Sequence, residues 1–137
     1  MRAGTLLTFA LLILVAGVAG CSRGADVVEG PDGTRLLVAS GEAPRMEALG
    51  TGRLTRGEDG CLYLAGDGYQ DLLVWPAGTR LADDEAAVHV PGAEPVVIGS
   101  DVELVGGGVA ADERTLPELP GECMADTVFL VSSVDAG

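Results

Sequence analysis

Short apolar runs separated by turn-forming residues fill the sequence from Leu49 onward. The runs follow one another at intervals of roughly ten residues, with glycine, proline or aspartate between them. Runs this short are too brief for typical helices and are characteristic of β-strands. We therefore expect an all-β fold, either a small antiparallel barrel or a compact sandwich. The expected strands comprise residues 49–56, 61–65, 72–75, 96–98, 101–105 and 128–134.

Three segments of this region carry further information. Residues 101–104 alternate polar and apolar side chains, as a half-buried strand does. Residues 106–108 are three consecutive glycines, which permit a bulge or a sharp bend. Residues 80–88 are compatible with one short helix.

The first twenty residues have the organisation of a secretory signal peptide. Arg2 supplies a positive charge, and an uncharged apolar run covers residues 6–19. This run of 14 residues is shorter than the ~20 that a helix needs to span a bilayer. A charged start, a short apolar core and small residues at its end indicate a cleaved N-terminal signal helix.

The apolar run ends in Val18-Ala19-Gly20-Cys21, which resembles the lipobox of bacterial lipoproteins. The resemblance implies a diacylglyceryl group on the thiol of Cys21, cleavage before Cys21 and further acylation of the new amino terminus. Two or more acyl chains give stable membrane attachment. The alternatives are an uncleaved helical anchor and an ordinary signal peptide followed by a chance cysteine. We expect a lipoprotein anchored through Cys21 on the extracytoplasmic face of the cell membrane.

Two cysteines remain if Cys21 carries lipid. Cys61 and Cys123 would then lie in an oxidising compartment, where an even pair indicates a disulfide. The bridge would span 62 positions, and chain-entropy estimates give such a loop about 4 kcal/mol of stabilisation. A catalytic thiol or a metal pair is the alternative, although His89 is the only histidine and a closed zinc site therefore lacks ligands.

Residues 22–47 separate the signal peptide from the expected strands. They contain two prolines, four glycines and charges of both signs. They form either a flexible tether or a tether that carries a small hairpin, with arms at 27–29 and 36–39 around a turn at 30–33. We favour the tether. The expected organisation is a signal peptide over 1–20, a lipidated cysteine and tether over 21–48, and a β-barrel domain over 49–137.

Residues 59–64, 72–78 and 98–108, together with the late Cys123, are similar to small OB-like barrels in which a glycine-rich coiled strand closes the sheet. More narrowly, they resemble a family of small secreted bacterial domains to which no activity is assigned. The resemblance covers residues 49–134. It implies an OB-like barrel and a Cys61–Cys123 bridge, and it implies no function.

The charge of the chain excludes several classes of partner. The sequence carries 8 basic and 21 acidic residues, and loss of residues 1–20 removes Arg2 and changes the net charge from −13 to −14. Contacts to phosphates need clustered cations, so we expect no nucleic-acid partner, even for an OB-like barrel. The same charge favours a protein or envelope partner with a basic surface.

Catalytic and metal-binding sets are difficult to assemble from this sequence, and we expect no cofactor. His89 and Ser100 are candidates for a nucleophile–base pair, but Ser100 lies in a segment that indicates a turn. The acidic groups 58–59 and 83–85 offer oxygens for Ca²⁺ without the spacing of an EF-hand loop. A solvated acidic face is the simpler interpretation of both groups.

Trp75 is the only tryptophan and is either a core residue or an exposed anchor for a ligand. With no catalytic set, we predict a non-enzymatic, lipid-anchored interaction module of the bacterial cell envelope. The alternatives are a structural or weakly cation-binding envelope lipoprotein and a small secreted hydrolase.

Overall fold

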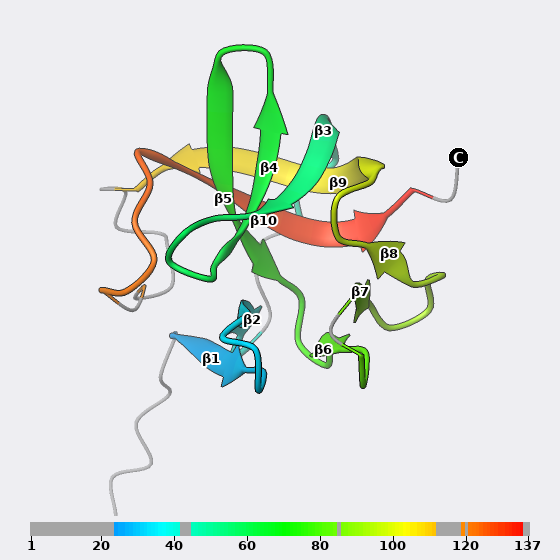
Figure 1. Cartoon of the computed structure of the whole chain (residues 1–137). Helices are drawn as coiled ribbons and strands as arrows, with labels where there is room; N and C mark the ends of the chain where they lie inside the picture. The colour runs from blue at the N-terminus through cyan, green and yellow to red at the C-terminus, as the bar shows by residue number, and fades with distance from the viewer. Residues whose placement is uncertain (1–23, 42–44, 85, 112–118, 120, 136–137) are drawn as a thin grey trace, which may run out of the picture.

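The computed structural model describes residues 24–41, 45–84, 86–111, 119 and 121–135 (Figure 1). The regular secondary structure of these residues consists entirely of β-strands, which confirms the predicted fold class. The strands are β1 (Ala25–Glu29), β2 (Arg35–Ala39), β3 (Ala48–Arg56), β4 (Leu62–Gly66), β5 (Tyr69–Trp75), β6 (Arg80–Leu81), β7 (Ala87–His89), β8 (Val96–Val97), β9 (Asp101–Ala110) and β10 (Thr127–Val134).

Five of these strands form a closed barrel. The order around the barrel is β3-β4-β5-β10-β9, and β9 returns to β3. Neighbouring strands are antiparallel except β5 and β10, which run parallel. Closure leaves no free edge within the ring of five strands. The small OB-like barrel expected from the sequence is therefore the fold that forms, and the alternative of a sandwich is not.

The hairpin of β1 and β2 adds to the barrel at the end of β5. Leu37 pairs with Val74 in a parallel register, and Leu36 and Leu37 are fully buried. The tether favoured over residues 22–47 is therefore wrong for residues 25–39, because β2 buries its apolar side chains against β5. The alternative of a hairpin at these residues is what the structure contains.

The folded domain consequently begins earlier than the sequence suggested. The carbonyl of Gly24 accepts a hydrogen bond from the backbone N–H of Ser40 at 2.9 Å. The expected domain boundary at residue 49 is therefore too late, because residues 24–40 belong to the folded domain.

Side chains at successive positions of the central strands pack alternately into two separate hydrophobic clusters. On β5, Leu73 and Trp75 belong to a cluster that includes side chains of all five barrel strands and fills the barrel interior. Leu72 and Val74 belong to a second cluster outside the barrel, which also contains Cys123. Burial on both faces explains why β2, β5 and β10 appear in the sequence as continuous apolar runs.

A second sheet of three short strands, in the order β6-β7-β8, lies between β5 and β9 in the sequence. Arg80 pairs with His89, and Val88 pairs with Val96. The short helix expected over residues 80–88 is therefore wrong. Val88 and Val96 pack in the barrel core, so extended strands bury the apolar residues of this segment.

β9 continues through the glycines at 106–108 instead of bending there. Val131 pairs with Gly106 and Ser133 pairs with Val105, so the expected bulge is present but its extra residue lies on β10. A Cβ atom on Gly106 would overlap the carbonyl oxygen of Leu130. Glycine thus permits the close approach of the two backbones.

Candidate functional site

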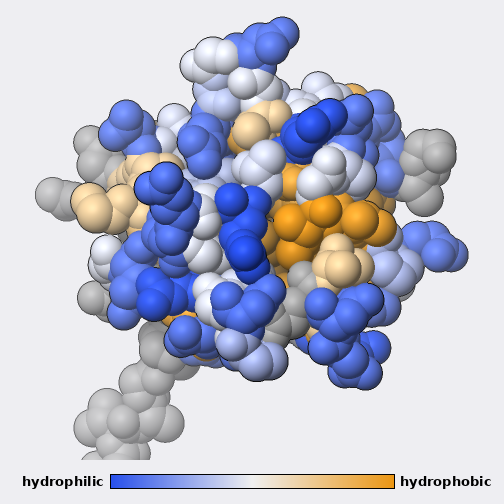
Figure 2. Space-filling model, viewed as in Figure 1, coloured by the Kyte–Doolittle hydropathy of each residue, from blue (hydrophilic) through white to orange (hydrophobic). Residues whose placement is uncertain are grey.

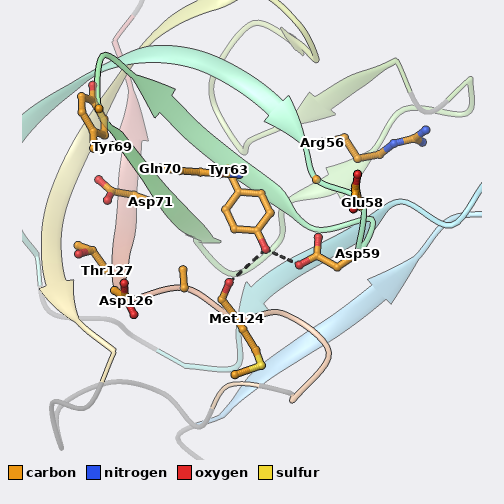
Figure 3. A pocket seen from close by; sticks show the side chains of 13 residues that line it. Arg56, Glu58, Asp59, Tyr63, Tyr69, Gln70, Asp71, Met124, Asp126 and Thr127 are labelled. Atoms are coloured by element: carbon orange, nitrogen blue, oxygen red, sulfur yellow. Dashed lines mark hydrogen bonds between the residues drawn. The ribbon is translucent and has the colours of Figure 1, made fainter.

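A hollow lined by acidic residues lies beside the hairpin of β4 and β5 (Figure 3). Its other walls are the turn before β4 and the segment before β10. We call it the acidic hollow. Its lining includes four carboxylates and one guanidinium. The lining residues are Arg56, Gly57, Glu58, Asp59, Tyr63, Gly68, Tyr69, Gln70, Asp71, Met124, Ala125, Asp126 and Thr127.

A disulfide joins two walls of the acidic hollow. Cys61 directly precedes β4, and Cys123 lies in the segment before β10. The two residues are bonded, with their Cα atoms 5.9 Å apart. The predicted pairing is the one that the structure contains. The bond limits how far the turn carrying Glu58 can move from the segment carrying Asp126.

Tyr63 lies between these two walls with only 5% of its surface exposed. Its hydroxyl donates to the carboxylate of Asp59 and lies 3.4 Å from the carbonyl oxygen of Met124. Burial, and secondarily the Asp59 carboxylate, raise the pKa of Tyr63 well above its ordinary value. The hydroxyl therefore remains a protonated donor at neutral pH.

Asp59 is held by its own turn. Its Oδ1 accepts the backbone N–H of Cys61 at 3.0 Å, while its Oδ2 accepts the hydroxyl of Tyr63. Asparagine and aspartate commonly stabilise turns through such contacts. The carboxylate that the sequence offered as a Ca²⁺ ligand therefore has a structural role.

Arg56 is directed away from Tyr63 and Asp71 (Figure 3). Its Nη1 lies 2.8 Å from Oδ2 of Asp32 and 3.0 Å from Oγ1 of Thr34. The backbone N–H of Thr34, then its hydroxyl, and to a smaller extent Arg56 hold the pKa of Asp32 below its ordinary value. The guanidinium thus links the turn of the β1–β2 hairpin to β3.

The opposite wall of the acidic hollow forms where β5 and the start of β10 lie side by side in a parallel register. Leu72 pairs with Val128, so the residues that directly precede them, Asp71 and Thr127, lie at neighbouring positions of the two strands. Burial raises the pKa of Asp71 above its ordinary value. Asp126 is exposed beside Thr127. Asp71 on β5 and Asp126 just before β10, which are far apart in the sequence, therefore line one hollow.

Tyr69 provides an aromatic surface at the same wall. Its hydroxyl donates to the carbonyl oxygen of Thr51, and its ring lies so close to Gly66 that a Cβ atom there would overlap it. The side chain is nevertheless 44% exposed. A fixed aromatic ring beside carboxylates suits a cationic group, which gains both ion pairing and a cation–π contact.

Trp75 is not the exposed anchor that the sequence allowed. Its side chain is fully buried in the barrel interior. Its backbone ends β5 and pairs there with the parallel strand β2. Trp75 is therefore a core residue, which was the other interpretation of the sequence.

His89 and Ser100 are not brought together in one depression. His89 is half-buried on β7 and pairs with Arg80. Ser100 lies in a turn and donates its hydroxyl to the carbonyl oxygen of Val97 at 2.6 Å. Ser100 lines a groove whose described lining does not include His89.

The remaining acidic group lies in the turn between β6 and β7. Asp83 and Asp84 are exposed, and Oδ1 of Asp84 accepts the backbone N–H of Ala86 at 3.2 Å. Glu85 lies outside the described residues. In the part of the chain that the structure describes, no group of three or more His, Cys, Asp or Glu side chains is placed to hold a metal ion.

The lipobox and Cys21 lie outside the described residues. Within those residues, no helix is long and apolar enough to cross a membrane.

Sequence reasoning missed three residues that line the acidic hollow, namely Tyr69, Asp71 and Asp126. Asp71 and Asp126 stand just before apolar runs, and Tyr69 follows a turn. Polar residues are common at such positions, so the pattern did not distinguish these three. The only available signal was that each aspartate stands just before an apolar run, and that an OB-like barrel places the strands of these two runs side by side.

Comparison of the chain with protein-family models, with curated proteins and with solved structures gave no match. Function is therefore inferred from the residues of the site.

Proposed function

We propose that this protein is a non-enzymatic binding module, lipid-anchored on the extracytoplasmic face of the bacterial cell membrane. In this proposal the acidic hollow receives an arginine or lysine side chain of an envelope protein. The observation that carries the proposal is the wall made by Tyr69, Asp71 and Asp126, from which the guanidinium of Arg56 is turned away.

The charges of the hollow supply the recognition chemistry. Asp71 and Asp126 offer oxygens to a guanidinium or ammonium group, and the ring of Tyr69 offers its face. The net charge of −14 on residues 21–137 adds a long-range attraction that accelerates association with a basic partner. Added salt weakens that attraction.

The proposed lipid anchor lies close to the folded domain. Cys21 precedes Gly24 by three residues, and Gly24 is bonded to Ser40. Three fully extended residues span at most about 11 Å. The proposed module is therefore held at the membrane surface, instead of being raised on the long tether that the sequence suggested.

The hydrogen bonding of Ser100, the candidate nucleophile, favours binding over hydrolysis as the function. Ser100 uses its hydroxyl within its own turn, and His89 belongs to the separate β6-β7-β8 sheet. The acidic hollow offers hydrogen-bond acceptors around a protonated tyrosine, which suits recognition of a cation.

The test compares an arginine with its uncharged isostere. The full-length protein, purified in detergent, is titrated with the peptide Gly-Arg-Gly and with the same peptide containing citrulline. Backbone NMR shifts of Tyr69 and Asp71 report occupancy of the hollow. We expect shifts with the arginine peptide that diminish as salt is raised, and an affinity about tenfold lower for the double variant Asp71→Asn/Asp126→Asn.

The matched control is Asp67→Asn/Asp83→Asn, which removes the same charge from two exposed positions outside the lining of the hollow. It should leave the affinity nearly unchanged. Equal binding of the citrulline peptide, or an equal loss in both double variants, would exclude the acidic hollow as the site.

A further inference from the structure

A second depression lies between β8 and the barrel and shares no lining residue with the acidic hollow. We call it the apolar groove. It is formed by the turn before β8, by β8 itself, and by the ends of β9 and β10 that meet beside it. The lining residues are Thr51, Gly52, Ala93, Glu94, Pro95, Val96, Val97, Ser100, Asp101, Val102, Glu103, Val134 and Asp135.

The floor of the apolar groove is hydrophobic. Val97 is 53% exposed, and Val102 and Val134 are partly buried against the barrel core. Figure 2 shows apolar surface, in orange, in the region that β8 occupies in Figure 1, with hydrophilic residues around it. Apolar surface bordered by polar residues is typical of a protein-binding site.

The walls of the apolar groove are held by backbone hydrogen bonds. The N–H of Gly99 donates to the carbonyl of Leu54 at 2.7 Å, and the N–H of Leu54 donates to the carbonyl of Ser100 at 3.0 Å. The N–H of Asp135 donates to the carbonyl of Glu103 at 3.1 Å. A groove built in this way is preformed and loses little conformational freedom when it binds.

The rim of the apolar groove is acidic. Glu94, Asp101, Glu103 and Asp135 are exposed around it, and none of the described residues that line it is basic. Asp101 of the rim is paired with Arg53, whose Nε lies 3.5 Å from Oδ1 of Asp101. Both side chains of this pair are largely exposed, so the pair is weak and can be exchanged for a partner's cation.

We propose that the apolar groove docks a basic amphipathic helix of a partner protein. Leucine-like side chains on one face of the helix would cover Val97, Val102 and Val134, and flanking lysine or arginine side chains would meet the acidic rim. β8 is an edge strand of only two residues, so it offers little backbone for strand addition. The floor consists of side chains from several elements, which suits the side-chain face of a helix.

The charge of the rim decides against two other occupants. A second copy of this chain would bring four further carboxylates against Glu94, Asp101, Glu103 and Asp135, at a Coulombic cost. An anionic bilayer would be repelled for the same reason. The groove is independent of the acidic hollow, so this inference goes beyond the function proposed above.

The test uses two peptides of equal composition. One peptide of about 14 residues carries lysine, leucine and alanine, with the leucines on one helical face; the other has the same residues in an order without such a face. Fluorescently labelled peptides are titrated against the full-length protein in detergent. We expect preference for the amphipathic peptide, an affinity about tenfold lower for Val97→Asp, and a weaker salt dependence for Glu103→Gln/Asp135→Asn.

The matched control is Val28→Asp on β1, which places the same charge at another exposed valine of 41% exposure. It should bind the amphipathic peptide as the parent protein does. Asp71→Asn/Asp126→Asn should do so too, which separates this result from the test of the acidic hollow. Equal binding of both peptides, equal loss in Val28→Asp and Val97→Asp, or dimerisation that Val97→Asp abolishes would each overturn the proposal.

Discussion

Cys61 and Cys123 form a disulfide with their Cα atoms 5.9 Å apart, and both belong to the hydrophobic cluster outside the barrel. The chain between them contains every strand from β4 to β9. One covalent bond therefore encloses most of the barrel and also sets the separation of two walls of the acidic hollow.

Replacing both cysteines by serine is expected to lower the melting temperature. A bridge that spans 62 positions restricts the unfolded chain by about 4 kcal/mol, and the variant also places two hydroxyls in the apolar outer cluster. Thermal unfolding of the parent protein with and without reductant, and of Cys61→Ser/Cys123→Ser, measures the effect. Membrane association should not change. A melting temperature that is insensitive to both treatments would contradict the expectation.

Asp71→Asn is expected to raise stability at neutral pH. Burial raises the pKa of Asp71 in the folded protein, so the folded state binds the proton more tightly than the unfolded state. Its contribution to stability is full below the ordinary aspartate value of about 3.9 and is lost as pH rises through the raised folded value. Asparagine does not ionise, so the variant does not lose stability in this way as the pH rises.

Melting temperatures measured as a function of pH test the sign of this effect. The difference between Asp71→Asn and the parent protein should be positive at neutral pH and shrink as the pH falls. Asp67→Asn, at an exposed turn of the same hairpin, is the control for the loss of one negative charge. A difference that does not vary with pH would show that burial of Asp71 is not its cause.

Gly106 and Gly108, two glycines of β9, are expected to respond differently to alanine. A Cβ on Gly106 would overlap the carbonyl of Leu130, whereas on Gly108 the nearest atom is Cγ2 of Thr127 at 3.9 Å. Gly106→Ala should cost about 2 kcal/mol or more, because two paired backbones must separate. Gly108→Ala should be neutral or slightly stabilising, because alanine restricts the unfolded chain. Chemical denaturation of both variants measures this contrast, and equal midpoints would contradict it.

Cys21 is expected to be the lipidated amino terminus of the mature protein. Mass spectrometry of protein extracted from membranes should show the loss of residues 1–20 and an added acyl mass. Cys21→Ala should release the domain from the membrane or leave it as the precursor. An intact Met1 on the membrane-bound protein would contradict the lipobox interpretation.

The strands of the barrel were predictable because their signals are local. Residues 61–65 and 128–134 are apolar runs, residues 49–56 lead directly into a turn sequence, and all three segments form strands. The hairpin of β1 and β2 was only the less favoured alternative, for the opposite reason. Leu37 is buried by Val74, a residue far along the chain, while its own neighbours are the prolines, glycines and charges that suggest a tether.

The acidic hollow was not predictable for a similar reason. Asp71 and Asp126 line one hollow because Leu72 and Val128 share a parallel register. Such a register is set by barrel closure and leaves no pattern near either aspartate. The disulfide was predictable because a count of cysteines, unlike a register, does not depend on the strand order.

The place of β10 between β5 and β9 determines when the domain can fold. Until residues 127–134 are available, the pairing of β5 with β10 cannot form, and the barrel stays open. Pairings between such distant segments form slowly. A precursor that is threaded across a membrane from its amino terminus would thus remain threadable until its last strand had emerged. In the proposed lipoprotein, lipid on Cys21 would hold the amino terminus close to the membrane, and the barrel would complete its folding there.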